Sequence, residues 1–134
     1  MTTTDTGVLG KIVQHPIDTI EVLTLDNAPD TVTAHCTEVD GLCPVTHQPD
    51  HYIVDLTYEV AANKVIESKA LKLYLWGFRD KGISCEAISA TIATDLHDQY
   101  QQITDHDTKF TVTATQQSRG GIALTATTTR GGTK

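Results

Sequence analysis

Hydrophobic and polar residues alternate in several stretches of the chain with the two-residue period of β-strands. Residues 18–26, 31–39 and 51–60 are rich in β-branched residues, and this pattern predicts three strands. The turn-forming segment DNAPD separates the first two and predicts that they form a hairpin. Residues 109–117 and 121–129 alternate again on either side of SRGG, which predicts a second hairpin.

The period becomes helical between the third strand and the second hairpin. The stretches ESKALKLYLWGFRDKG (67–82) and ISCEAISATIATDLHDQY (83–100) each place apolar residues on one helical face. These residues are Leu71, Leu75 and Phe78 in the first stretch, and Ile88, Ile92 and Leu96 in the second. We therefore predict two helices, separated near Gly82, and the order β-β-β-α-α-β-β. This order indicates an α+β fold, in which an antiparallel sheet carries a helix pair on one face.

This predicted sheet leaves one face and its edges uncovered, so we expect the protein to assemble into a homo-oligomer. A length of 134 residues suits one domain with one core. Residues 1–7 and 130–134 are small and polar without periodicity, and we expect both ends to be loose.

Composition and charge narrow the classes of function. The formal net charge of −7 lacks the basic face that nucleic-acid binding normally requires. Neither a membrane-length apolar run nor a signal-peptide pattern is found, so we expect a cytoplasmic protein with no membrane partner. The chain has three cysteines, an odd number, which favours at least one free thiol.

The segment GLCPVTHQPD (41–50) places a thiol, Cys43, and a carboxylate, Asp50, on a proline-rich stretch. An accessible thiolate can act as a nucleophile, and a nearby carboxylate can carry protons to and from the adduct. A buried structural cysteine beside a proline turn is an equally simple interpretation. Zinc is a third, because His35, Cys36, Cys43, His47 and His51 are crowded, although their spacing matches no compact finger.

Two further motifs favour the catalytic interpretation. LCPVTHQPD is followed by ESKALKLYLWGFR and later by RGGI (119–122). Together they resemble the QueF family, nitrile reductases that use NADPH to convert 7-cyano-7-deazaguanine to 7-aminomethyl-7-deazaguanine. The resemblance implies the tunnelling fold, in which subunits of antiparallel sheet and paired helices assemble into rings. It also implies sites between subunits, here in a decamer of two pentamers.

The resemblance assigns the chemistry to two residues. Cys43 would add as thiolate to the nitrile carbon and form a covalent thioimide, and Asp50 would deliver the proton that the nitrogen needs. Two hydride transfers from NADPH would follow. The prolines suit this role because each restricts the backbone and thereby holds thiol and carboxylate in place.

The resemblance also assigns residues that bind substrate and cofactor. In the ESKALKLY motif, Glu67 and Ser68 would contact the substrate's edge, and Lys69 and Lys72 would contact NADPH, as cations suit phosphates. Without the motif, these charges would be an ordinary solvated helix face. The resemblance also implies that Arg119, in RGGI, serves the cofactor and that Glu86 accepts hydrogen bonds from the deazapurine.

Three residues depart from the family pattern close to this chemistry. The family has Phe-His where this chain has Ser84 and Cys85, and usually has Gly in place of His47. The match therefore puts Cys85 in the substrate site, whereas a buried core thiol and reversible pairing with Cys43 are alternatives. His47 follows Cys43 closely enough to serve as a proton relay in place of the missing histidine.

Three other functions remain as alternatives to the reductase. An amidinotransferase-type relative would form the same thioimide and let ammonia attack it, without hydride. A non-catalytic ring would bind deazapurine through Glu86 alone. A zinc cyclohydrolase on the same scaffold would need metal-ligand spacings that this chain lacks.

Overall fold

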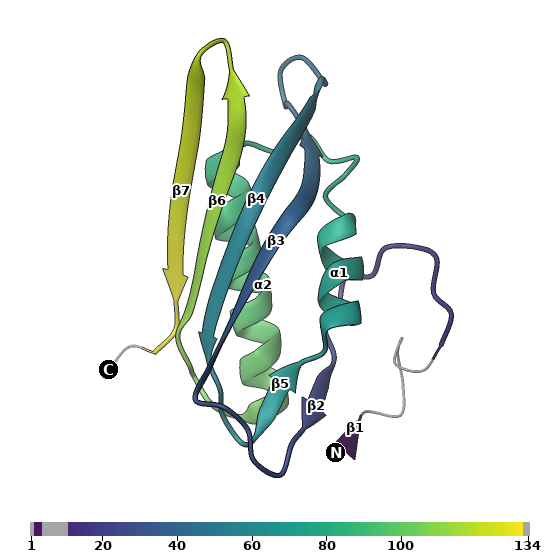
Figure 1. Cartoon of the computed structure of the whole chain (residues 1–134), viewed down its shortest axis with the longest axis vertical. Helices are drawn as coiled ribbons and strands as arrows, with labels where there is room; N and C mark the ends of the chain where they lie inside the picture. Colours follow the sequence, from purple (N-terminus) through teal and green to yellow (C-terminus); the bar gives the residue numbers. More distant parts are fainter. Residues whose placement is uncertain (1, 4–10, 133–134) are drawn as a thin grey trace.

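The computed structural model describes residues 2–3 and 11–132 of the chain. Its strands and helices are β1 (Thr2–Thr3), β2 (Val22–Thr24), β3 (Thr31–Leu42), β4 (Pro49–Glu59), β5 (Lys64–Ile66), α1 (Ser68–Trp76), α2 (Cys85–Thr104), β6 (Phe110–Arg119) and β7 (Ile122–Arg130). A four-stranded antiparallel sheet has the order β3-β4-β6-β7, and a smaller antiparallel sheet has the order β1-β2-β5. Both helices pack on the same face of the larger sheet (Figure 1).

The core lies between this face and the two helices. The side chains of β4 alternate, so that Tyr52, Val54, Leu56 and Tyr58 are all at most 2% exposed. Ile88, Ile92 and Leu96 of α2 are fully buried against them, as the helical period predicts. The α+β class, the helix pair and the β6–β7 hairpin are thus confirmed.

The first predicted hairpin is wrong. The strand β2 pairs with β5, a three-residue strand that the pattern does not reveal, and β3 pairs with β4 instead. The connection between β2 and β3 is held by the segment after β4, because Leu25 N–H donates to Asn63 O and Val60 N–H to Asp30 O. This connection therefore carries the chain from the small sheet, which contains β2, to the large sheet, which contains β3.

The two ends predicted to be loose are only partly described. Thr2–Thr3 form β1, and the rest of 1–7 lies outside the described residues, as do 133–134. Arg130 is the last residue of β7, and its Nε donates to Thr94 Oγ1 at 3.2 Å. Within the described part of the chain, no helix has the length and apolar character needed to cross a membrane.

His97 joins α2 to the loop that precedes β6. Its Nδ1 lies 2.9 Å from Asp98 Oδ1, and its Nε2 lies 2.5 Å from Asp107 Oδ1. A Cβ at Gly131, where φ is +77°, would overlap the His97 ring. The backbone just after β7 therefore packs directly against this ring. Burial alone would lower the pKa of His97, but the hydrogen bonds and charges of Asp107 and Asp98 outweigh it and raise the pKa.

We expect His97→Gln to destabilise the protein more at low pH than at high pH. Because the folded pKa lies above the ordinary 6.5, the stabilisation is complete below that value and is lost as pH rises through the folded pKa. Unfolding free energies should differ by about 1–2 kcal/mol near pH 6, the size of a charge-assisted hydrogen bond, and converge near pH 9. A difference that grew with pH would contradict this role.

Candidate active site

Cys43 begins the short loop that joins β3 to β4. Its N–H donates to Gln48 O at 2.8 Å, and its carbonyl accepts from His47 N–H at 2.9 Å. These two bonds close the loop on itself, and His47 occupies the left-handed region with φ at 60°. The thiol of Cys43 is therefore half-buried on a tightly held turn, whereas the side chain of His47 is exposed.

Asp50 lies in β4 and not on the loop, since β4 begins at Pro49. It pairs in register with Gly41, and its side chain belongs to the inward-facing set of β4, with only 4% exposed. The predicted proline-rich loop thus ends earlier than the sequence pattern suggests. Burial in a strand fixes the Asp50 carboxyl more firmly than a loop position would.

The α1–α2 connection pairs with the end of β3 immediately before Cys43. Leu42 N–H donates to Lys81 O, and Ile83 N–H donates to Leu42 O, each at 2.9 Å. A Cβ at Gly82 would lie 3.4 Å from Pro44 Cα, so glycine allows the connection to approach the Cys43 loop closely. The first turn of α2 therefore lies near the Cys43 loop.

Three of the residues discussed above begin α2. Ser84 is the N-cap, and its Oγ accepts from Ala87 N–H at 3.2 Å. Glu86 follows in the first turn, where the helix dipole favours a carboxylate, and its side chain is exposed. An exposed carboxylate near Cys43 can accept hydrogen bonds from the donor edge of a purine-like ring.

Cys85 points into the core between β6 and β7. It is 1% exposed, and its Sγ donates to Ala114 O at 3.4 Å. Burial raises the pKa of the Cys85 thiol, and the charges of Glu86 and Asp50 add to the effect, against the backbone N–H groups of Gln116 and Ala126. Cys85 is therefore a buried core thiol, which was the alternative to a place in the substrate site. It lies close to the carboxylates of Glu86 and Asp50.

The ESKALKLY residues lie on α1. Glu67 is the N-cap of α1, and its two carboxylate oxygens accept from Ala70 N–H at 2.8 Å and from Lys69 N–H at 3.0 Å. Glu67 is only 8% exposed, and both of its carboxylate oxygens are used in this cap. Ser68 is exposed, and Lys69 Nζ donates to Lys11 O.

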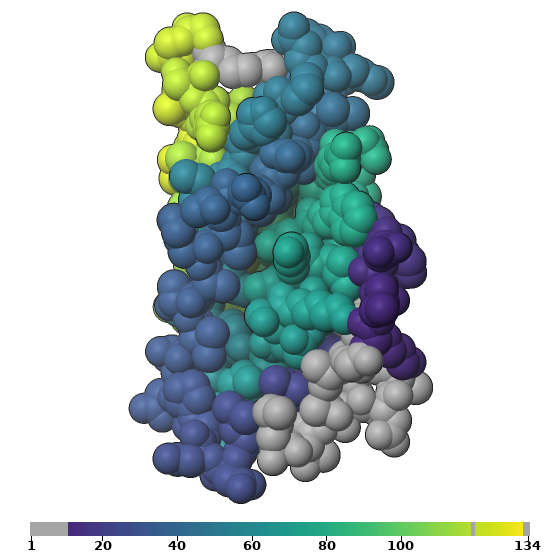
Figure 2. Space-filling view, turned by 45° about the vertical axis from the view of Figure 1, so that its right-hand side comes forward, coloured from purple at the N-terminus to yellow at the C-terminus, as the bar shows by residue number. Residues whose placement is uncertain are grey.

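A groove runs between α1 and β3 (Figure 2). Its first part has a volume of about 300 Å³ and is lined by Cys36, Glu38, Ser68, Lys72 and Leu75, among others. A second part of about 490 Å³ shares Glu38, Lys72 and Leu75 and continues to Trp76 and Arg79. Burial, with Asp55 nearby, raises the pKa of the Cys36 thiol, which makes it a poor nucleophile at neutral pH.

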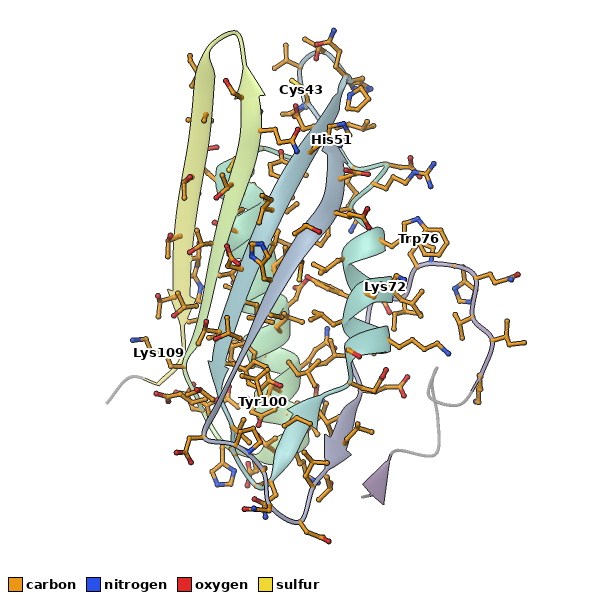
Figure 3. The ribbon with its side chains drawn as sticks, in the orientation of Figure 1. Cys43, His51, Lys72, Trp76, Tyr100 and Lys109 are labelled. Atoms are coloured by element: carbon orange, nitrogen blue, oxygen red, sulfur yellow. The ribbon has the colours of Figure 1, made fainter. Side chains whose placement is uncertain are left out.

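The predicted site residues near Cys43 and the predicted site residues on α1 lie apart within one chain. Figure 3 shows Cys43 at one end of the sheet and Lys72 apart from it on α1. Arg119 ends β6 at the turn into β7, and this turn lies at the Cys43 end of the sheet (Figure 1). The side chain of Arg119 lies outside the described residues.

Among the residues that the structure describes, no three His, Cys, Asp or Glu side chains are grouped so that they could hold a metal ion. Two of the crowded histidines, His35 and His51, pair with carboxylates instead. His35 pairs with Asp55, and His51 Nδ1 lies 2.7 Å from Asp40 Oδ1.

Sequence reasoning missed three residues of the groove: Glu38, Trp76 and Arg79. The spacing of Lys72, Trp76 and Arg79 is a signal that could have placed them on one side of α1 and the turn that follows it. Glu38 comes from β3, and no local pattern connects it with α1.

Comparison with known proteins decides the family. A family model described as QueF-like protein matches residues 49–134, which include Asp50, the ESKALKLY motif, Glu86 and Arg119. The chain belongs to the QueF-like protein family. Cys43 and His47 lie before the matched range, so their assignment depends on the LCPVTHQPD motif and on the geometry above.

Curated relatives of this QueF-like chain are named NADPH-dependent 7-cyano-7-deazaguanine reductase. The Magnetococcus marinus protein is 48% identical over 48% of this chain and 50% of its own length. A protein of Anaeromyxobacter sp. (strain Fw109-5) is 44% identical over 51% of this chain and 55% of its own. The chain thus spans about half the length of these relatives. The Frankia casuarinae protein is 34% identical over 82% of this chain and 83% of its own length.

A solved structure shares the fold of this QueF-like chain. The apo form of an archaeosine synthase described as QueF-Like matches with a TM-score of 0.63 and 19% identity, over 81% of this chain and all of the other. At this identity the likeness shows the fold alone, and it confirms the predicted fold class.

Proposed function

We propose that this chain is an NADPH-dependent nitrile reductase that converts 7-cyano-7-deazaguanine to 7-aminomethyl-7-deazaguanine. The observation that carries the proposal is the joint placement of a half-buried Cys43 on a closed turn, a buried Asp50 and an exposed Glu86 at one end of the sheet. The names of the curated relatives support the same reaction.

The proposed first step adds the Cys43 S–H across the nitrile. The sulfur bonds to the nitrile carbon, one C–N π bond breaks, and Asp50 passes the proton released by the thiol to the nitrogen, which gives a thioimide. Glu86 holds the ring by accepting hydrogen bonds from its donor edge, which keeps the nitrile over the thiol. His47, exposed on the same loop, can exchange protons between this site and solvent.

The α1 residues suit the cofactor. Lys72 and Arg79 line the groove, and neither side chain has a hydrogen-bond or ion-pair partner among the described residues. Such cations can bind phosphate groups without first breaking an existing pair. Bound NADPH would supply hydride to the carbon that Cys43 holds.

The two groups of residues must come from different copies if both are to serve one site. We propose a ring, expected to be a decamer of two pentamers, in which the Cys43 end of one copy meets α1 of its neighbour. β3 and β7 are the edge strands of the larger sheet, so their outer edges are the natural places for copies to join. The cytoplasmic location stays a prediction.

The direct test follows NADPH absorbance with 7-cyano-7-deazaguanine as substrate. We expect two NADPH oxidised for each nitrile reduced, since nitrile to amine is a four-electron reduction, and no oxidation by the Cys43→Ala variant. NADPH oxidation that continued in Cys43→Ala would contradict the proposed mechanism. Product formed with ammonia and without NADPH would favour the amidinotransferase alternative.

A further inference from the structure

Trp76 is an exposed aromatic residue at a groove lined by charged side chains. It is the only tryptophan of the chain and is 37% exposed, at the end of α1. Figure 3 shows Trp76 and Lys72 on neighbouring turns of α1. Since a large aromatic side chain gains free energy by burial, its position beside a hollow indicates a surface that a flat ligand can cover.

The charges around Trp76 are arranged for an anion. Arg79 lies in the turn after α1, where its N–H donates to Trp76 O at 3.1 Å, and both residues line the groove of about 490 Å³ together with Lys72. Asp40 lines the same part, but its carboxylate is already paired with His51 at 2.7 Å. Lys72 and Arg79, which precede and follow Trp76 in the sequence, are therefore both available to bind an anion.

Glu38 gives the groove one acceptor. Its carboxylate lines both parts of the groove and has no hydrogen-bond or ion-pair partner within the described ranges 2–3 and 11–132. A carboxylate accepts hydrogen bonds from ribose hydroxyls, a role that lysine and arginine cannot fill. The groove thus offers a stacking surface, phosphate-binding cations and a hydroxyl acceptor together.

We infer that this groove binds the adenosine-phosphate half of the dinucleotide, with Trp76 stacked on adenine, Arg79 and Lys72 on the phosphates, and Glu38 on a ribose. This inference rests on the proposed function, and it adds Trp76, Arg79 and Glu38, which lie outside the ESKALKLY motif, to the cofactor role that the motif implies for Lys72. The nicotinamide half then extends past Ser68 and Lys69 toward the reacting carbon in the neighbouring copy's Cys43 site.

The single tryptophan makes the test direct. Titration of the whole protein with 2′,5′-ADP should quench Trp76 fluorescence in a saturable way, because an adenine ring stacked on indole quenches its emission. Nicotinamide mononucleotide, which lacks adenine, should leave the emission unchanged at the same concentrations. NADPH should displace 2′,5′-ADP from the site.

Variants separate the roles of the residues. Arg79→Gln and Lys72→Gln should each weaken 2′,5′-ADP binding about tenfold, because each removes a charge-assisted hydrogen bond. The matched control is Lys109→Gln, an exposed lysine immediately before β6 and away from α1, which should leave binding unchanged (Figure 3). Trp76→Leu, followed by calorimetry, should also weaken binding about tenfold, whereas Trp76→Phe should retain most of it.

The outcomes distinguish this inference from the proposed function. Nitrile-dependent NADPH oxidation without any quenching by millimolar 2′,5′-ADP would overturn the inference and leave the reductase standing. Quenching that depends on Arg79, without NADPH oxidation, would support the groove assignment and count against the reductase. Emission that changes on dilution but not with 2′,5′-ADP would show that another copy of the chain covers Trp76, and would overturn the inference.

Discussion

Mixing the reduced protein with 7-cyano-7-deazaguanine alone is expected to add one substrate mass to the peptide that carries Cys43. Thiolate addition to a nitrile needs no hydride, so the adduct should form without NADPH. Cys43→Ala should abolish it completely, because Cys36 and Cys85 both have raised thiol pKa values and are poor nucleophiles. Mass spectrometry of the intact and digested protein measures both results.

Two further variants test the neighbours of Cys43. Asp50→Asn should slow adduct formation about 100-fold, since the imide nitrogen loses its proton donor. Cys85→Ala should leave the adduct intact, because this thiol is buried against β6 and β7. An adduct on Cys85 or no adduct at all would refute the covalent mechanism, whereas an adduct that NADPH does not consume would favour the ammonia-using alternative.

Local periodicity was sufficient for the long elements of the fold. In α2 the apolar residues recur over five turns, and the buried residues Ile88, Ile92 and Leu96 are the ones that the period predicts. In β4 the alternation from Tyr52 to Tyr58 predicts the buried face in the same way. Such patterns are visible because each long element buries one continuous face.

The pairing of the short strands could not be predicted in this way. The strand β5 has three residues, too few to show alternation, and its partner β2 lies about 40 residues earlier in the chain. The hydroxyl of Tyr100, which accepts from Ala61 N–H and donates to Lys64 O, helps to hold the segment around β5 against α2. A long-range tyrosine contact of this kind leaves no local signal in the sequence.

For the candidate site too, some features could be predicted from motifs, whereas others are visible only in the structure. Cys43, Asp50 and Glu86 were identified from motifs, and the structure brings them to one end of the sheet. The burial of Asp50 in β4 and the capping of α1 by Glu67 depend on strand register and helix geometry, which spacing alone does not give. The groove residues Glu38 and Arg79 come from different elements, so only the folded chain places them together.

Mixing two inactive variants is expected to show that the Cys43 end and the α1 residues of one site belong to different copies. Cys43→Ala lacks the nucleophile, and Lys72→Glu puts a repulsive charge where a phosphate must bind, so each should be inactive alone at limiting NADPH. The two variants would be unfolded together, refolded as a mixture and assayed for nitrile-dependent NADPH oxidation. Each variant refolded by itself is the control.

Activity in the mixture should return to about a quarter of the wild-type value if each site lies between two copies of a ring. A working site then needs Cys43 from a Lys72→Glu copy and Lys72 from a Cys43→Ala copy, and random assembly at equal amounts gives that combination at about one interface in four. If both groups belonged to the same chain, every site would carry one defect and the mixture would stay inactive. Because Cys43 and Lys72 lie apart on the single chain, we expect recovery. An inactive mixture of correctly assembled rings would refute the shared site and require a rearrangement within one chain to bring α1 to Cys43.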